Sequence, residues 1–391
     1  MQEWVHQLIV IGNGFDLACG LRSNYSDFFT DLPSAILPDP GKITEQNWGM
    51  YLRERGYTVW DVILCHYHPM DQWCNVEKHI GEWIAEDTPD SALDHVDKVL
   101  AVLRGNGHIA SPQRTMPANW RYYAGSLSRD FPELDVARFL HDTHPDHVGG
   151  GWTRQLVFDA LLDELHLLEM RFSKYLEAEV ESSKDYCARS HSLLSRLKEV
   201  RTSPQDYQYD TSILSFNYTM PWEYGPSILE GSDQPVCIHG CLLDGDIIFG
   251  IDGTDCMGDA EAVPFTKTYR VMALDTGDVG EIIRSVSDGH REATSLIKFF
   301  GHSLSKADYA YFQALFDAVD LYGGSTTLVF YYRPHGADAD SAVDDARERE
   351  SMMRRVTELL VAYGKTLDNG SHGRNLIHRL LLEGRLHVQR I

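Results

Sequence analysis

The sequence has little positive charge. Lysine and arginine together number 35 against 58 aspartates and glutamates, so the formal net charge is −23 at pH 7. An acidic surface of this kind repels nucleic acids and anionic membranes, and no run of basic residues offers a local exception. We therefore expect neither a nucleic acid nor a membrane among the partners.

Cysteine motifs and long apolar runs are absent as well. The seven cysteines are odd in number and scattered, and no second pair accompanies Cys237 and Cys241 to complete a zinc site. The N-terminal residues 1–6 lack the basic and apolar parts of a signal peptide, and no apolar run is long enough to span a membrane. These absences predict a soluble cytoplasmic protein with reduced thiols and no bound metal.

A histidine-rich stretch is the one place that invites a metal-site interpretation. His141, His144 and His147 recur at every third position, with Asp142 and Asp146 among them. Pro145 interrupts any helix there, and no second group of ligands is evident. We expect an exposed loop.

The stretch from Leu8 to Leu21 carries the strongest single signal. Leu8–Ile11 is a short apolar run typical of a strand buried on both faces, and Gly12-Asn13-Gly14 follows it directly. A helix from about Phe15 to Cys19 would direct its N-terminus at the same place, so we expect the N–H groups of Gly12 to Phe15 to bind phosphates. The alternative is a tight turn without a ligand, because Leu17 stands where the dinucleotide fingerprint has its third glycine.

The rest of the chain alternates between strand and helix patterns. Prolines at 33, 38 and 40 mark a first boundary, and helical periodicity dominates from about 42 to 205. We therefore predict an α/β core with a Rossmann-like parallel sheet, formed by 1–35 and 206–391, and a mostly helical insertion at 36–205. The expected later strands are 211–216, 235–238, 246–251, 295–300 and 325–332. The expected helices are 75–86, 93–104, 152–183, 191–200, 306–319 and 341–363, and the acids of 152–183 are expected on a solvated face.

Polar residues and glycines follow five of the predicted strands. In sequence order these are Gly12-Asn13-Gly14, Asn217, His239-Gly240, Asp252-Gly253 and Gly301-His302-Ser303. Ligands of open parallel sheets bind beyond the carboxyl ends of the strands, so we expect these residues to line one crevice. Each also has a plain structural explanation: Asn217 could cap a turn, His239 could be a partly buried histidine, and Ser305-x-x-Asp308 could be a helix capping box.

These residue types suit a dinucleotide whose ribose is attacked. Asn217 can hold a ribose hydroxyl or a water molecule without adding charge, and His239 can accept a proton near neutral pH. Ser303 can bond a phosphate or the second ribose. A nicotinamide ring bonded to ribose is already positively charged and leaves as a neutral molecule, so cleavage of its bond to the ribose needs no metal. A dinucleotide that carries nicotinamide, such as NAD+, would suit these residues.

The chain resembles the bacterial AbiH family of phage abortive-infection proteins. The resemblance is carried by Ile11-Gly-Asn-Gly-Phe-Asp-Leu-Ala-Cys-Gly-Leu21 with Tyr25-Ser-Asp-Phe28, Trp73-x-x-Val-Glu77, Ser215-Phe-Asn-Tyr-Thr219, Ile238-His-Gly240, Ile247-Ile-Phe-Gly-Ile251 and Phe300-Gly-His-Ser-Leu-Ser-Lys-Ala-Asp-Tyr309. More distantly, the same motifs resemble the sirtuin fold. That resemblance implies a sirtuin-type core, a phosphate loop at Gly12, Gly14 and Phe15, catalytic Asn217 and His239, and a cofactor contact at Ser303.

The sequence differs from the sirtuin pattern at several positions, and these differences limit which sirtuin properties can be expected of it. Asn13 replaces alanine, Arg22 stands where proline is usual, and the zinc module is missing, which argues against protein deacylation. Asp16 replaces serine and brings a carboxylate close to the expected phosphates, which weakens their binding unless Asp16 faces a ribose hydroxyl or the N–H groups of its own loop.

The AbiH resemblance implies an abortive-infection effector, and the sirtuin resemblance implies that it hydrolyses NAD+ to nicotinamide and ADP-ribose. The cofactor-binding set is Gly12, Asn13, Gly14, Phe15, Asp16, Asp252, His302 and Ser303. A phage or defence-system protein is the expected trigger, and a homo-oligomer or complex is the expected state. Two alternatives stay open: a nucleotide-binding sensor or scaffold without turnover, and a metal-dependent hydrolase or transferase for another nucleotide or RNA, with Asp16 and Asp252 as ligands.

Overall fold

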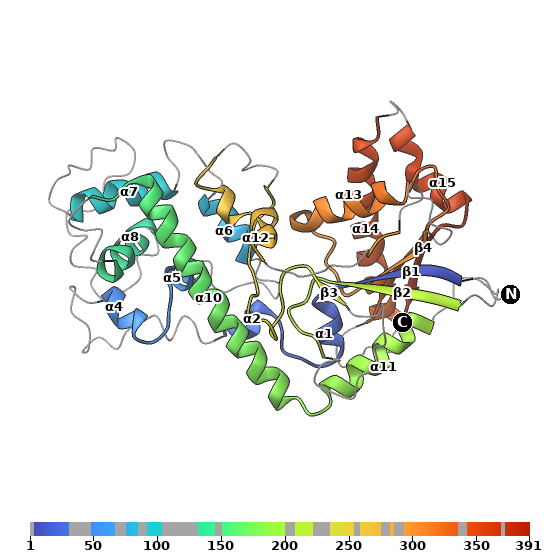
Figure 1. Cartoon of the computed structure of the whole chain (residues 1–391), viewed down its shortest axis with the longest axis horizontal. Helices are drawn as coiled ribbons and strands as arrows, with labels where there is room; N and C mark the ends of the chain where they lie inside the picture. Colours follow the sequence, from blue (N-terminus) through green and yellow to red (C-terminus); the bar gives the residue numbers. More distant parts are fainter. Residues whose placement is uncertain are drawn as a thin grey trace. The chain divides into compact units, whose positions relative to one another are not determined.

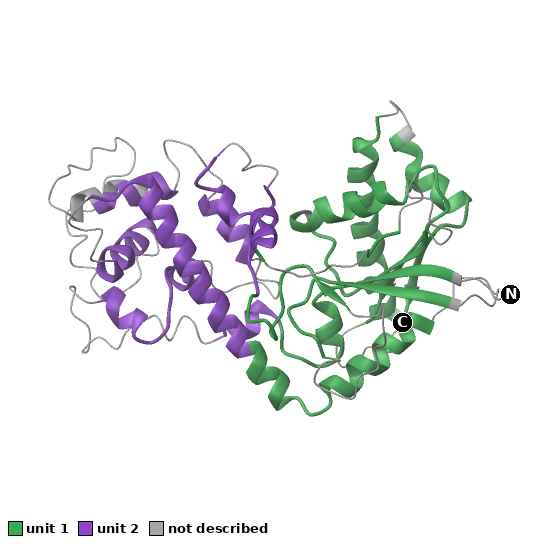
Figure 2. Ribbon diagram, in the orientation of Figure 1, with its two compact units in different colours: residues 1–23, 176–246, 274–391 green, residues 24–175, 247–273 purple. Residues whose placement is uncertain are grey.

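The computed structural model describes residues 4–30, 48–66, 76–84, 92–103, 132–144, 151–199, 208–221, 235–253, 259–274, 282–284, 293–334, 342–368 and 372–391. The chain forms two compact units (Figure 2). Unit 1 comprises 1–23, 176–246 and 274–391, and unit 2 comprises 24–175 and 247–273. The predicted domain limits at 35/36 and 205/206, the prolines at 33–40 and His147 all lie outside the described residues.

Unit 1 is built on a six-stranded sheet in which all pairings are parallel (Figure 1). The strands are β1 (Trp4–Ile11), β2 (Gln208–Ser215), β3 (Val236–Cys237), β4 (Thr294–Phe300), β5 (Thr327–Tyr332) and β6 (Leu386–Arg390). Their spatial order is β3-β2-β1-β4-β5-β6. The predicted α/β class with a Rossmann-like parallel sheet is confirmed. This order reverses direction between β1 and β4, where doubly wound sheets form their ligand crevice.

The apolar run of β1 serves both faces of the sheet. Successive strand residues point to opposite faces, so Leu8 and Val10 join one buried cluster, whereas Ile9 and Ile11 join the other. Each of these four side chains is fully buried. This explains why the run is apolar without alternation.

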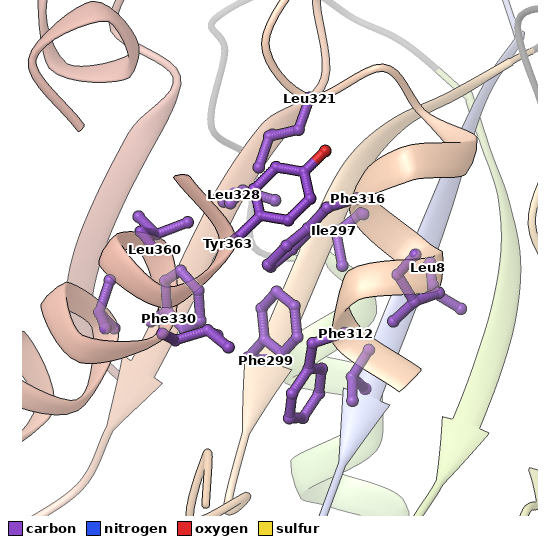
Figure 3. Close-up of a cluster of buried hydrophobic side chains, with 14 of the residues drawn as sticks. Leu8, Ile297, Phe299, Phe312, Phe316, Leu321, Leu328, Phe330, Leu360 and Tyr363 are labelled. Atoms are coloured by element: carbon purple, nitrogen blue, oxygen red, sulfur yellow. The ribbon is translucent and has the colours of Figure 1, made fainter. Parts of the chain in front are cut away.

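Helices cover each face of the sheet. On one face lie α13 (Tyr309–Ala318), α14 (Ala342–Thr366) and α15 (Leu376–Leu382), preceded by the 3-10 turns η6 (Lys306–Asp308) and η7 (His372–Asn375). Figure 3 shows Phe312 and Phe316 of α13 and Tyr363 of α14 against Phe299 and Phe330, whose rings stack with centroids 4.5 Å apart. On the other face lie α1 (Gly14–Ala18) and α11 (Tyr186–Glu199). Helix α11 was expected in the helical insertion, but it covers the sheet of unit 1.

Two of the strand expectations need correction. Residues 246–251 do not form a strand of the sheet: they lie mostly in unit 2 and make only a single bridge, between Ile251 and Thr266. The segment is apolar because Ile247, Ile248 and Phe249 are buried there, and the N–H of Phe249 donates to the Glu169 side chain instead of a neighbouring strand. Conversely, β6 and α15 were not predicted.

Unit 2 is helical in the part that the structure describes. It contains α2 (Tyr25–Phe28), α4 (Trp48–Arg53), α5 (Val59–His66), α6 (Val76–Ile84), α7 (Ala92–Leu103), α8 (Pro132–Thr143), η4 (Val263–Phe265) and α12 (Lys267–Ala273). The long helix α10 (Arg154–Ser182) contributes most of its length and then continues into unit 1. No helix among the described residues is long and apolar enough to cross a membrane.

The acids of α10 are not all solvated, contrary to the expectation. Glu164 is fully buried, where it pairs with Arg53 and accepts the N–H of Val59 at 3.1 Å. Glu169 is also buried and pairs with Arg270 at 2.8 Å. A charge is tolerated in a protein interior when a partner charge and hydrogen bonds replace its water. Both carboxylates therefore hold separate segments of unit 2 together.

Candidate functional site

Four loops of unit 1 leave the carboxyl ends of neighbouring strands and bring most of the predicted residues to one edge of the sheet. They are Gly12–Asp16 after β1, Asn217 after β2, His239 after β3 and Gly301–Ser303 after β4. Asp252 is not part of this set. It belongs to unit 2 and follows no strand, because 246–251 packs in that unit. Its expected place at a strand end is wrong.

The glycine turn after β1 packs tightly against the loop after β4. The N–H of Gly12 donates to Phe300 O at 3.1 Å, that of Gly14 to Gly301 O at 2.7 Å and that of Phe15 to Gly12 O at 2.8 Å. A Cβ on Gly14 would lie 2.7 Å from the Gly301 Cα. The glycines are thus required for the close approach of two backbones. Three N–H groups expected to bind phosphate already have protein acceptors, so phosphate contact there stays a prediction.

Asn13 and Phe15 both brace this turn. The Ser23 hydroxyl donates to Asn13 Oδ1 at 2.5 Å, and Asn13 Nδ2 donates to Ser23 O at 3.3 Å. Phe15 is fully buried, and its ring meets Phe300 edge-on with centroids 6.3 Å apart. Both side chains therefore make contacts within the protein, and their contact with a cofactor stays a prediction.

Asp16 lies in a buried triad of oxygen atoms. Its carboxylate accepts the Tyr186 hydroxyl at 2.8 Å and the Thr219 hydroxyl at 2.6 Å, and the two hydroxyl oxygens are 2.9 Å apart. Burial raises the pKa of the Asp16 carboxyl to about 6, although hydrogen bonds from Thr219 and Tyr186 and the nearby Asn217 amide lower it. Asp16 ties the turn to α11 and to the loop after β2. Tyr186 and Thr219 were not predicted as site residues from the sequence. The only available signal was that a buried carboxylate needs hydrogen-bond donors.

The burial of Asp16 makes stability depend on pH. Burial raises the pKa of the Asp16 carboxyl to about 6 in the folded chain, so the folded state holds this proton more tightly than the unfolded state does. Between pH 4 and 6 the folded chain keeps a proton that the unfolded chain has lost. The free energy of unfolding therefore falls as pH rises through this window, by on the order of 2 kcal/mol from this group.

We expect Asp16→Asn to remove this contribution. We measure the unfolding midpoints of the parent and the variant by thermal denaturation from pH 4 to 7. As the pH rises, the midpoint of the parent should fall relative to that of the variant. Subtracting the variant cancels the titration of the other acidic groups. A difference that stays constant over this range would contradict the assignment.

Two histidines and one carboxylate form a second buried group. His302 Nε2 lies 3.3 Å from Asp308 Oδ2, and His239 Nε2 lies 3.7 Å from Asp308 Oδ1. Exposed fractions are 3% for His239, 6% for His302 and 7% for Asp308. Phe216 contacts both imidazoles edge-on, with centroids 5.4 Å and 4.5 Å away. The group is therefore shielded from water by aromatic rings.

Asp308 was not identified as a site residue from the sequence. It was interpreted as part of a capping box with Ser305, but as the N-cap of α13 it makes no side-chain cap bond, and its carboxylate faces the histidines instead. Ser303 is exposed, and its hydroxyl accepts the N–H of Ser305 at 3.3 Å. The signal for Asp308 was the spacing of His302 and Asp308 across a short loop.

The side-chain amide of Asn217 is buried beside Asp16. Its backbone N–H donates to the Ser215 hydroxyl at 3.1 Å, but neither Oδ1 nor Nδ2 of the amide makes a hydrogen bond of ordinary geometry with any described residue. The side chain is nevertheless 3% exposed. Leaving a buried amide unbonded is unfavourable, so such groups usually have a functional partner or an ordered water.

No three His, Cys, Asp or Glu side chains come together as a metal-binding group within the described parts of the chain. The alternative that pairs Asp16 with Asp252 as ligands places one carboxylate in each unit. Both Asp16 oxygens already accept hydroxyl hydrogens. The residues present therefore give this alternative little support.

The parallel sheet, its strand order and the polar loops at its carboxyl edge define a doubly wound α/β protein with a Rossmann-like core. The chain belongs to the AbiH family, since the model of that family, described as bacteriophage abortive infection AbiH, matches residues 8–332. Membership supports a role in phage abortive infection. No curated protein and no solved structure matches the chain. The match ends with the last residue of β5, so α14, α15 and β6 lie beyond it.

Proposed function

We propose that the carboxyl edge of the sheet binds NAD+ and hydrolyses it to nicotinamide and ADP-ribose as the effector step of abortive infection. The observation that carries the proposal is the buried amide of Asn217, which lies beside Asp16 and makes no hydrogen bond of ordinary geometry with any described residue. It follows β2, the neighbour of β1, and the strand order reverses between β1 and β4. Doubly wound sheets bind dinucleotides at that reversal.

Each step of the reaction has a candidate side chain. A water molecule attacks C1′ of the ribose, the bond from C1′ to the nicotinamide nitrogen breaks, and its electron pair leaves with the nicotinamide, which becomes neutral. His239 accepts the proton released by the water, and Asp308 stabilises the imidazolium that forms. The Asn217 amide holds the water or a ribose hydroxyl. His302 and Ser303, in the loop after β4, would contact the second ribose and the phosphates.

The direct test is incubation of the purified chain with NAD+, with nicotinamide and ADP-ribose separated by chromatography. We expect the parent to release both products, and His239→Ala to lower the rate by about 100-fold or more. Addition of EDTA should leave the rate unchanged. An intact NAD+ pool after incubation with the parent, or full activity of the His239→Ala variant, would contradict the proposal.

A sensor that binds the nucleotide without turnover is the second candidate. The near-complete burial of Asn217, His239 and His302 favours it, because a closed site suits a retained ligand. This function predicts binding heat in titration calorimetry without nicotinamide release. In either case we propose a phage or defence-system protein as the trigger, and a homo-oligomer or complex as the acting form.

A further inference from the structure

The tautomer of His302 is set by the backbone. The N–H of Leu304 donates to His302 Nδ1 at 2.9 Å, and a backbone amide nitrogen cannot act as an acceptor. Nδ1 must therefore be unprotonated, and the ring proton is on Nε2. That nitrogen lies 3.3 Å from Asp308 Oδ2, so His302 is a donor to this carboxylate.

The loop that carries His302 has an unusual backbone conformation. Leu304 has φ +58°, in the left-handed region that residues with a side chain rarely adopt, and Gly301 at the start of the same loop has φ +73°. The Leu304 side chain packs against the buried cluster that contains Leu8, Phe299 and Phe330, and this packing holds the residue in its conformation. Strain of this kind persists where the surrounding structure imposes it, and it is common at functional sites.

Asp308 connects the two histidines. One carboxylate oxygen faces His302 Nε2 and the other faces His239 Nε2. The second distance, 3.7 Å, is longer than a hydrogen bond, and such contacts in sites without ligand often shorten once the substrate is bound. The Phe216 ring touches both imidazoles, and Tyr311 lies edge-on to His239 with centroids 5.8 Å apart. The rings limit the orientations open to His239.

We propose that Asp308 is the positioning residue for His239, that His302 is its fixed donor, and that the basic atom of His239 is therefore Nδ1. A carboxylate that already accepts one N–H orients the second imidazole with its Nε2–H inward, so the lone pair is on Nδ1. In the reaction that Nδ1 takes the proton of the attacking water, while Nε2–H stays toward Asp308. The catalytic part of this inference rests on the proposed function; the tautomers do not.

The tautomers can be measured without substrate. In the full-length chain labelled with ¹⁵N-histidine, nitrogen chemical shifts distinguish protonated from unprotonated ring nitrogens, and His239→Gln and His302→Gln assign the two rings. We expect both rings to carry their proton on Nε2. Asp308→Asn should move the His239 signals. Asp317→Asn is the control: Asp317 is in α13, whose N-cap residue is Asp308, but the Asp317 carboxylate accepts the Tyr363 hydroxyl. This control should leave the His239 signals unchanged.

A His239 proton on Nδ1, or His239 signals that Asp308→Asn does not move, would overturn the inference. The parent spectrum decides the tautomers even if the Asp308→Asn variant does not fold. In the NAD+ assay, Asp308→Asn should lower kcat by about 100-fold or more with little change in KM, whereas a KM effect alone would assign Asp308 to binding. If the parent has the expected tautomers but releases no nicotinamide, the proposed function fails while the assignment of Asp308 stands.

Discussion

Asn217→Ala is expected to reduce nicotinamide release by about 100- to 1,000-fold while leaving the melting temperature unchanged or slightly raised. The two effects separate because the Asn217 amide is buried without a hydrogen bond of ordinary geometry to any described residue. Removing such a group deletes an unfavourable burial, and the Asp16 carboxylate beside it keeps the hydroxyl hydrogen bonds of Tyr186 and Thr219. Its presence in the fold is then explained by the ligand or water that it holds.

Gln7→Ala provides a matched control for this variant. Gln7 is also a buried amide, but its Nε2 donates to the Thr211 hydroxyl at 2.9 Å and to Lys198 O at 3.3 Å. We expect this control to lose about 1–3 kcal/mol of stability and to keep its turnover per folded molecule. Rates come from chromatography and stabilities from thermal denaturation. A large loss of stability in Asn217→Ala, or turnover equal to that of the parent, would show that the amide has a structural role.

Gly301→Ala is expected to have the largest effect on stability, a loss of about 3–5 kcal/mol. The residue has φ +73°, and a Cβ there would collide with the Phe15 nitrogen and lie 2.7 Å from the Gly14 carbonyl carbon. Both neighbours are backbone atoms of the glycine turn, so they cannot move aside as a flexible side chain would. Left-handed backbone costs about 1–2 kcal/mol for alanine, and forced overpacking adds about 1–3 kcal/mol.

Gly384→Ala separates these two costs. Gly384 has nearly the same backbone conformation, φ +67°, but nothing lies within 4 Å of the position that a Cβ would take there. We expect the control to lose only the about 1–2 kcal/mol of backbone strain. Thermal denaturation of both variants measures the difference. Equal losses would mean that the two loops can separate without cost, and that the glycine turn is not held by the loop after β4.

Much of the fold could be predicted from local patterns. The run Leu8–Ile11 is buried on both faces of the sheet, and Val76, Ile80, Trp83 and Ile84 are buried along α6 as their spacing indicated. The same reasoning failed for 246–251, because a short buried apolar run looks alike in a strand and in a loop that packs under helices. It also missed β6, where no residue is fully buried and no clear period is present.

The candidate site was predicted only in part. Asn217, His239 and His302 could be found because each follows an apolar run within two positions, which places it at a strand end. Tyr186 could not, and Asp308 was interpreted as a helix cap, since the contacts of Tyr186 with Asp16 and of Asp308 with His239 join residues distant in sequence. Tyr186 bonds Asp16 across 170 positions of the chain. A helix-capping pattern and a catalytic carboxylate look the same until the partners of the carboxylate are known.

The sequence by itself determined the class of the protein: an acidic α/β chain of the AbiH type with glycines and polar residues at the ends of its strands. Local composition and periodicity carry that information because burial selects apolar residues and turns select glycine. Only the tertiary structure decided what those residues do. It showed that the glycine turn bonds the loop after β4, that Asp16 braces α11, and that Asp308 lies between two histidines, because each of these roles depends on which distant backbone or side chain comes within hydrogen-bond distance.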